Sequence, residues 1–201
     1  MSKAKNTALI VVDVQRDFCE GGALAASDTL PLLAPLQQAI DQARRVGATL
    51  VFTQDWHPDS HSSFKPNGGP WPVHCVENSS GAELMPPIAA APGDIIIHKG
   101  VTIDGPGYSG FDATGLASYL TKRGISQVAV AGIATEYCVR ATALDAASAG
   151  FSTVVLKDVV RAVDENQTEK VSQELKNSGV SMTTAKQWLD QLYAGHPPQN
   201  L

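Results

Sequence analysis

Short apolar segments alternate with amphipathic segments along most of the chain. Segments rich in Val, Ile and Leu predict strands at residues 8–12, 49–53, 94–98, 127–132, 152–156 and, more weakly, 179–183. Between them, apolar residues at helical spacing predict helices at residues 30–46, 115–123, 136–149, 165–177 and 185–193. Glycines 47, 124, 150 and 179 mark helix ends. Near-continuous apolar strands that alternate with helices predict an α/β fold, with a parallel sheet covered on both faces.

One long segment interrupts this alternation. Residues 55–92 are rich in Pro, Gly, Ser and Asn and show little periodicity. A structureless loop of this length is uncommon inside a compact domain. The segment holds three of the five histidines and two of the three tryptophans, a poor composition for disorder. We therefore expect an ordered insertion around residues 55–92 that builds a site.

Length, charge and cysteine content narrow the class of protein. A chain of 201 residues suits a single domain, 1–201, and a net charge of −5 does not suit nucleic-acid binding. No apolar run approaches membrane-spanning length, and residues 7–12 are too short for a signal-peptide core. Three cysteines, an odd number, favour a reducing compartment, so we expect a cytoplasmic protein. The tail at 195–201 is expected to be mobile, and a homo-oligomer is compatible with the sequence.

Cys138 lies where a predicted strand leads into a predicted helix. Thr135 is a suitable N-cap for this helix, and Glu136 in its first turn suits the helix dipole. Unpaired N–H groups at a helix start stabilise a thiolate, so Cys138 is a candidate nucleophile that ionises readily near neutral pH. The alternative is a small buried cysteine that packs the junction.

Polar residues follow four of the predicted strands. They are Asp13, Asp55, Lys99 and Cys138. Ligands of open parallel sheets bind outside the carboxyl ends of the strands, where the strand order reverses. An acid, an amine and a thiol gathered there indicate a reactive site. Taken singly, Asp13 also suits a cap or turn, and Lys99 also suits a solvated side chain.

The histidines of the insertion form a second candidate cluster. Asp55 and His57 alternate along an extended segment, so both side chains can point the same way. With His61 and His74 they offer nitrogen and oxygen ligands for Zn²⁺, Fe²⁺ or Mn²⁺. The spacing matches no zinc finger. Cys75 is either a soft ligand or, as we favour, a buried structural cysteine.

Five segments together resemble the nicotinamidases (pyrazinamidases), which are isochorismatase-like cysteine hydrolases. In chain order they are Asp13–Phe18 (DVQRDF), Asp55–His57 (DWH), Trp71–Cys75 (WPVHC), Lys99 and Gly132–Val139 (GIATEYCV). The resemblance covers nearly the whole chain. It implies a three-layer α/β/α sandwich on a six-stranded, mostly parallel sheet. It also implies hydrolysis of nicotinamide to nicotinic acid and ammonia, and of pyrazinamide, in NAD salvage.

The resemblance also implies a role for each site residue. Asp13, Lys99 and Cys138 match the catalytic triad. Asp55, His57 and His74 match ligands of one divalent ion, with Zn²⁺ first and Fe²⁺ or Mn²⁺ as alternatives; His61 matches a fourth position that differs among members. Phe18, Trp71 and Tyr108 match the aromatic walls around the substrate ring. A cis peptide before Ala134 is expected to aim the N–H groups of Ala134 and Cys138 at the oxyanion, with Ala134 beside the substrate.

Two other interpretations remain open. One is another cysteine amidase of the superfamily, acting on N-carbamoyl or ureidoacrylate-type substrates; those relatives generally lack the metal, so the histidines argue against it. The other is a non-catalytic metal-binding or redox-sensing protein that uses Cys138 as a reactive thiol. In that case Asp13 and Lys99 would have no evident purpose.

Overall fold

The computed structural model describes residues 3–194 and centres on one six-stranded sheet. Its strands are β1 (Thr7–Val12), β2 (Thr49–Asp55), β3 (Ile95–Lys99), β4 (Gln127–Ile133), β5 (Ser152–Arg161) and β6 (Ser181–Thr183). They lie in the order β3-β2-β1-β4-β5-β6, and every neighbouring pair is parallel. The near-continuous apolar pattern of the central strands follows from burial on both faces: all six residues of β1 are buried.

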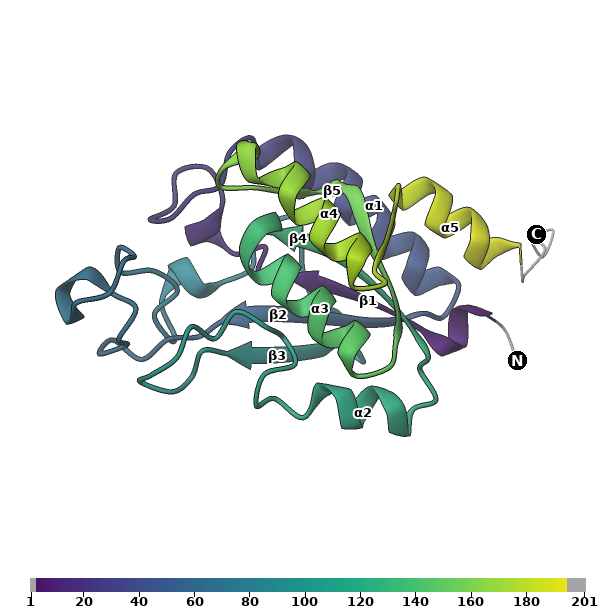
Figure 1. The fold of residues 1–201 in the computed structure, drawn as a ribbon, viewed down its shortest axis with the longest axis horizontal. Coiled ribbons are helices and arrows are strands. Elements are labelled where there is room, and N and C mark those ends of the chain that lie inside the picture. The colour runs from purple at the N-terminus through teal and green to yellow at the C-terminus, as the bar shows by residue number, and fades with distance from the viewer. Residues whose placement is uncertain (1–2, 195–201) are drawn as a thin grey trace.

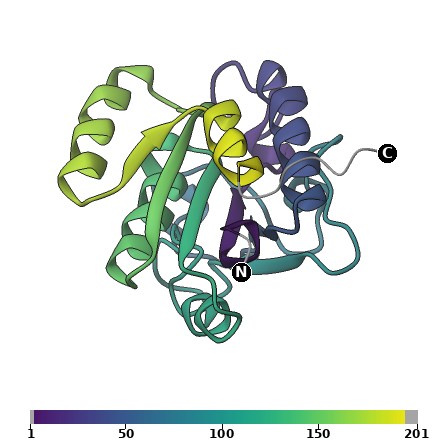
Figure 2. The ribbon, with the colours of Figure 1, turned by 90° about the vertical axis from the view of Figure 1, so that its right-hand side faces the viewer.

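Helices cover both faces of this sheet, so the three-layer α/β/α fold is confirmed (Figures 1 and 2). The helices are α1 (Leu30–Arg45), α2 (Leu116–Lys122), α3 (Arg140–Ser148), α4 (Thr168–Asn177) and α5 (Ala185–Tyr193). Buried side chains of α1 and α5 join one apolar cluster with β1 and β2. Those of α2, α3 and α4 join a second cluster on the other face. The glycines expected after helices, at positions 47, 124, 150 and 179, all have positive φ.

The strand β5 is longer than its apolar run predicts. Val130 of β4 pairs with Val155, but Gly132 pairs with Val160, so extra residues of β5 lie between these two pairs. The exposed Lys157 and Asp158 fall in this irregular stretch. Because these two residues are polar, the apolar run that predicts the strand ends before them. The backbone pairs with β4 again after them.

The insertion after β2 is folded and lies beyond the carboxyl ends of β2 and β3 (Figure 1). It contains two short 3-10 turns, η3 (Lys65–Asn67) and η4 (Ser80–Ala82). Isolated bridges join His57 to Val76 and Phe64 to Trp71. Phe64 and Cys75 are fully buried. Apolar packing and backbone pairing thus hold this glycine- and proline-rich chain in place.

The structure bears on membrane-spanning helices but not on the C-terminal tail. Within the described residues, no helix combines the length and the apolar character needed to cross a membrane. The expected mobile tail, residues 195–201, lies outside the described part of the chain.

Candidate active site

The predicted reactive residues meet at the carboxyl edge of the sheet. Asp13 follows β1, Asp55 ends β2 and Lys99 ends β3, and the register places Asp55 beside Lys99. The strand β1 lies between β2 and β4, which is where the chain reverses its direction of travel across the sheet. The crevice expected at such a switch point is therefore where these side chains lie.

Asp13 is fixed by its neighbours on β2 and β3. It is fully buried and has a φ of 48°. Its Oδ1 accepts a hydrogen bond of 2.6 Å from the Thr53 hydroxyl, and the Lys99 Nζ lies 2.7 Å from its Oδ2. Burial raises the pKa of Asp13, although Lys99 and Thr53 oppose the shift. The result is a carboxylate that is unusually ready to accept a proton.

Lys99 is the buried cation at the centre of the site. Its Nζ donates to Asp55 Oδ1 at 2.5 Å, to the Gly107 carbonyl at 3.0 Å and to Cys138 Sγ at 3.4 Å. Burial alone would lower the pKa of Lys99, but the Asp13 and Asp55 carboxylates outweigh burial and raise it well above its ordinary value. Lys99 therefore remains a cation between two acids and a thiol.

The surroundings of Cys138 correct two expectations. Ala134, whose backbone is extended, occupies the N-cap position in place of Thr135, and residues Thr135–Val139 form a π-helical turn (η5) ahead of α3. Thr135 is already inside this turn, so its side chain does not cap it. Burial raises the pKa of the Cys138 thiol well above its ordinary value; Lys99 opposes this shift and Asp13 adds to it. In the resting site, this raised pKa disfavours the thiolate that the sequence predicts near neutral pH.

The charges of the site explain how this thiol can still lose its proton. Ionised Asp13, Asp55 and Lys99 together carry one net negative charge, and release of the thiol proton to solvent would make it two. Transfer of the proton to Asp13 leaves the net charge unchanged. A carboxylate oxygen of Asp13 and Cys138 Sγ lie within 4.8 Å of each other. The geometry favours proton transfer inside the site over a preformed thiolate.

Asp55, His57 and His74 converge on one point beside this site. One possible ligand atom of each lies within 4.8 Å of the other two, and all three residues are buried. The Nδ1 atoms of His57 and His74 lie 2.8 and 2.7 Å from the carbonyl oxygens of Gly100 and Pro72. A carbonyl only accepts, so each Nδ1 carries a proton, and in the neutral ring each Nε2 has a lone pair for a cation.

His61 lies beside these three residues but outside their closest group. Its ring centroid is 4.1 Å from that of His57, and its Nδ1 lies 2.7 Å from the Ser63 hydroxyl. Within residues 3–194, its Nε2 is one of few buried side-chain nitrogen or oxygen atoms without a hydrogen-bond partner. An orphaned nitrogen next to two imidazoles and a carboxylate fits a divalent metal site.

Electrostatics also fit a cation at this point. Burial lowers the pKa of both His61 and His74, which keeps these rings neutral and able to ligate. Burial also lowers the pKa of His57, but the Asp55 carboxylate outweighs it, so the pKa of His57 is raised. Asp55 thus favours positive charge on the His57 side of the cluster.

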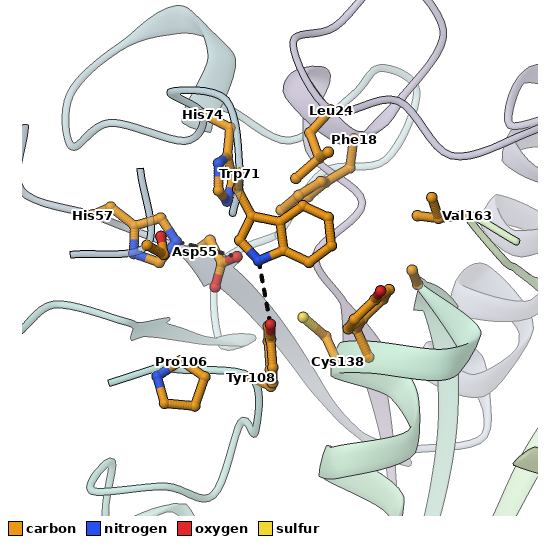
Figure 3. Close-up of a pocket in the computed structure, with 13 residues that line it drawn as sticks. Phe18, Leu24, Asp55, His57, Trp71, His74, Pro106, Tyr108, Cys138 and Val163 are labelled. Carbon is orange, nitrogen blue, oxygen red and sulfur yellow. Dashed lines mark hydrogen bonds and ion pairs between the residues drawn. The ribbon is translucent and has the colours of Figure 1, made fainter. Parts of the chain in front are cut away.

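Aromatic side chains form the walls of the pocket above Cys138 (Figure 3). Phe18, Trp71 and Tyr108, the residues expected around a substrate ring, all line it. Trp71 Nε1 donates to the Tyr108 hydroxyl at 3.3 Å. Tyr137, to which the sequence assigned no role, also lines the pocket, and its ring packs edge-on against Trp71. The same pocket reaches Asp55, His57 and His74, so the thiol and the metal-type ligands open into one space.

The cis peptide expected before Ala134 is present. The peptide between Ile133 and Ala134 is cis. Gly132 has a φ of 117°, and a Cβ there would lie 2.1 Å from the Val12 carbonyl oxygen. Only glycine lets β4 approach β1 this closely before the chain turns toward Cys138.

Sequence reasoning missed the groups that support the acids. The Gln15 side chain accepts from the Asp55 N–H and donates to the Asp55 carbonyl, both at 2.8 Å. Thr53 orients Asp13 from the neighbouring strand. Gln15 lies in the motif Asp13–Phe18, and Thr53 lies two residues before Asp55. Only the register of β1 and β2 brings Gln15 to Asp55 and Thr53 to Asp13.

Comparison with known proteins identifies the family. The isochorismatase domain family matches residues 7–187. The chain belongs to this family. A nicotinamidase of Acinetobacter baylyi is 39% identical to it, with 92% of this chain and 96% of the relative covered.

Solved structures of other isochorismatase-family members agree with the fold. The pyrazinamidase of Pyrococcus horikoshii in complex with zinc has a TM-score of 0.86 and 42% identity, covering 89% of this chain and 99% of that one. PnC1 from L. infantum in complex with nicotinate also has a TM-score of 0.86, with 37% identity over 92% and 96% of the two chains. The zinc-containing relative and the cluster around His57 together support a divalent metal ion here.

Proposed function

We propose that this protein is a nicotinamidase, which hydrolyses nicotinamide to nicotinic acid and ammonia and also accepts pyrazinamide. The observation that carries the proposal is the shared pocket: the buried thiol of Cys138, aromatic walls and metal-type ligands all line one space, and Lys99 and Asp13 lie beside the thiol. A flat ring with a carboxamide on one side and a nitrogen on the other matches that arrangement. The nicotinamidase relatives support the same substrate.

The first half of the proposed reaction forms a thioester. Asp13 takes the proton of Cys138 while Sγ attacks the carboxamide carbon, and the carbonyl oxygen becomes an oxyanion. The N–H groups of Ala134 and Cys138 are proposed to hold this oxyanion; one such donor is worth about 3–4 kcal/mol in other enzymes. When the C–N bond breaks, Asp13 returns the proton to the leaving ammonia.

The second half restores the enzyme. Water attacks the thioester carbon, gives a proton to Asp13 and releases nicotinic acid as the C–S bond breaks. The proton then returns to the sulfur of Cys138. Lys99 keeps Asp13 oriented and offsets the negative charge that remains in the site throughout both steps.

Asp55, His57 and His74 are the proposed ligands of one divalent ion, with His61, which lies outside their closest group, as the proposed fourth. When bound, the ion supplies a Lewis-acid contact for the ring nitrogen, directly or through water, and so positions the ring. Mixed imidazole and carboxylate donors suit Zn²⁺ first, with Fe²⁺ or Mn²⁺ as alternatives. Phe18, Trp71 and Tyr108 are proposed to hold the two faces of the ring.

The proposed setting is NAD salvage in the cytoplasm. Cys19, Cys75 and Cys138 are all free and buried, which supports a reducing compartment.

Ammonia release from a small set of amides tests the proposal. We expect nicotinamide and pyrazinamide to be hydrolysed much faster than benzamide, which has the same shape but no ring nitrogen. A site that binds a polar group can reject an analogue without it by up to about 10⁴-fold. Equal rates on nicotinamide and benzamide, or a preference for an N-carbamoyl or ureidoacrylate-type amide, would assign the chain to another amidase activity of the superfamily.

A further inference from the structure

The Glu136 carboxylate binds the backbone of a segment that lies far from it in the sequence. Its Oε1 accepts hydrogen bonds from the N–H groups of Val163, at 2.9 Å, and Asp164, at 2.7 Å. Its Oε2 lies 3.2 Å from the Val163 nitrogen. Glu136 belongs to the π turn that carries Cys138, so one side chain ties the nucleophile's turn to the end of β5.

Val163 is part of the pocket wall. It lines the pocket together with Cys138 and Tyr137, and 36% of its surface is exposed. Figure 3 shows it on the side of the pocket opposite to His57 and Asp55. If the ring nitrogen of a substrate faces those ligands and the carboxamide faces Cys138, ring carbons remote from the nitrogen face Val163.

The segment around Val163 has other anchors on both sides of it. Upstream, the Ala162 carbonyl accepts from the Ser27 N–H. Downstream, the Asp164 carboxylate accepts from the Asn166 N–H and begins the short turn η6 (Glu165–Gln167). Between these anchors, the hydrogen bonds described for the N–H groups of Val163 and Asp164 go to Glu136. Its carboxylate therefore sets how far Val163 reaches into the pocket.

We propose that Glu136 is a specificity-determining positioning residue: by holding Val163 in place, it limits the pocket to carboxamide rings without bulky substituents at carbons remote from the ring nitrogen. This inference rests on the proposed nicotinamidase function and adds to it a restriction on ring size. Glu136 acts through Val163 and does not touch the reacting atoms.

The test compares kcat/KM for 4-methylnicotinamide, whose methyl group is on the carbon opposite the ring nitrogen, with kcat/KM for nicotinamide. A hydrophobic contact with one extra carbon discriminates by about tenfold or more. We therefore expect Glu136→Ala and Val163→Ala each to raise the ratio by about tenfold. Because both changes remove the same barrier, the double variant should rise no more than about twofold above the larger single effect. Glu136→Gln keeps an oxygen that can accept both N–H groups, and should restore a ratio within about twofold of the wild type.

Glu174→Gln is the matched control. Glu174 pairs with Arg140 beside the same turn, so the variant removes a nearby carboxylate without touching the Val163 segment. Its ratio should equal that of the wild type. If the wild type hydrolyses nicotinamide, the proposed function stands. An unchanged ratio in Glu136→Ala, or additive effects in the double variant, would then overturn the inference alone.

Hydrogen exchange of the Val163 and Asp164 amides gives a readout that needs no activity. Exchange should be faster in Glu136→Ala and unchanged in Glu174→Gln. If the wild type hydrolysed no pyridine carboxamide, the proposed function would fail, and this measurement would still decide whether Glu136 holds the segment. Unchanged exchange in Glu136→Ala would refute that role outright.

Discussion

Asp55 joins the two halves of the site through its two carboxylate oxygens. Oδ1 accepts from Lys99 at 2.5 Å, and Oδ2 lies 3.4 Å from His57 Nε2. Burial alone would raise the pKa of Asp55, but Lys99 and His57 outweigh burial and lower it, so this acid stays ionised. Asp13 differs, since burial raises its pKa. Two buried acids that both lie beside Lys99 thus suit different tasks. Asp13 can exchange a proton, and Asp55 can hold cations.

The first prediction concerns the three cysteines. Cys138→Ser should fold and bind metal but lose nearly all amidase activity, because a hydroxyl is far less acidic than a thiol and Asp13 is too weak a base to ionise it. Cys19→Ser and Cys75→Ser should keep substantial activity, apart from any loss of packing. Steady-state ammonia release, with unfolding temperatures measured alongside, checks this.

A covalent probe locates the nucleophile independently. Nicotinaldehyde should form a thiohemiacetal at Cys138, which mimics the tetrahedral intermediate. Burial raises the pKa of all three thiols, so the distinction is geometric: Cys138 accepts a hydrogen bond of 3.4 Å from Lys99 Nζ and lines the pocket, whereas Cys19 and Cys75 are not among the residues that line it. Labelling by a substrate-like electrophile mainly at Cys75, or full turnover in Cys138→Ser, would contradict the proposed nucleophile.

The second prediction separates the histidines. His57→Ala removes a member of the three-residue group and should abolish stoichiometric metal binding. His61→Ala should weaken binding less, by about 10- to 100-fold, in the range found when supporting groups of metal sites are replaced. Metal content after dialysis, together with competition against a chelator, measures both. A larger loss in His61→Ala than in His57→Ala would make His61 the principal ligand.

Strand ends predicted that Asp13, Asp55, Lys99 and Cys138 gather at one edge of the sheet, but not how these side chains pair. Asp13, Lys99 and Cys138 do lie together, and Asp55, His57 and His74 form their own group. The contact between Asp55 and Lys99 depends on the parallel register of β2 and β3, which apolar periodicity does not encode. The raised pKa of Cys138 depends on burial and on the nearby acids Asp13 and Asp55, which only the folded chain brings to this thiol.

At the scale of the elements, apolar runs located the six strands and five α-helices of the described residues, but not each boundary. The helix α5 covers the predicted residues 185–193, because apolar positions at helical spacing coincide with a capping box at Thr184. Two elements differ most from their predictions. The strand β5 continues past its polar stretch, and the predicted helix 136–149 is a π turn followed by α3. Both differences arise from backbone geometry that the side-chain pattern does not determine.

The third prediction concerns the close approach of β4 to β1. Gly132→Ala should destabilise the protein by about 3 kcal/mol or more, because strain at positive φ and overpacking against Val12 add together. Gly150→Ala is the matched control: its φ is also positive, at 91°, but a Cβ there meets no atom within 4 Å. It should cost about 1–2 kcal/mol, the cost of the left-handed backbone alone. Urea unfolding of both variants measures the difference, and equal losses would mean that Val12 yields to the added methyl group.

At the scale of the whole molecule, the sheet and the insertion contribute different parts of one site. The strand ends supply Asp13, Asp55 and Lys99, and the turn after β4 supplies Cys138. The insertion supplies His57, His74 and Trp71, with His61 beside His57. The two apolar clusters on the faces of the sheet do not depend on any metal ligand. The fold should therefore persist when the metal ion is removed, although the position of the insertion depends partly on apolar packing and partly on the metal ligands.

The last prediction follows from this division. Removal of the metal by a chelator should leave the sheet folded but lower the unfolding temperature, because a ligand present at 100 times its Kd stabilises a protein by about 2.7 kcal/mol. For a chain of this size that corresponds to a fall of about 5–10 °C. Hydrogen exchange should increase mainly in residues 57–76, which carry the histidine ligands, and little in β1 and β4. Nicotinamide turnover should fall and return on addition of Zn²⁺. Global unfolding of the metal-free protein at room temperature would show that the ion supports the core, and full activity without any metal would refute its role in positioning the ring.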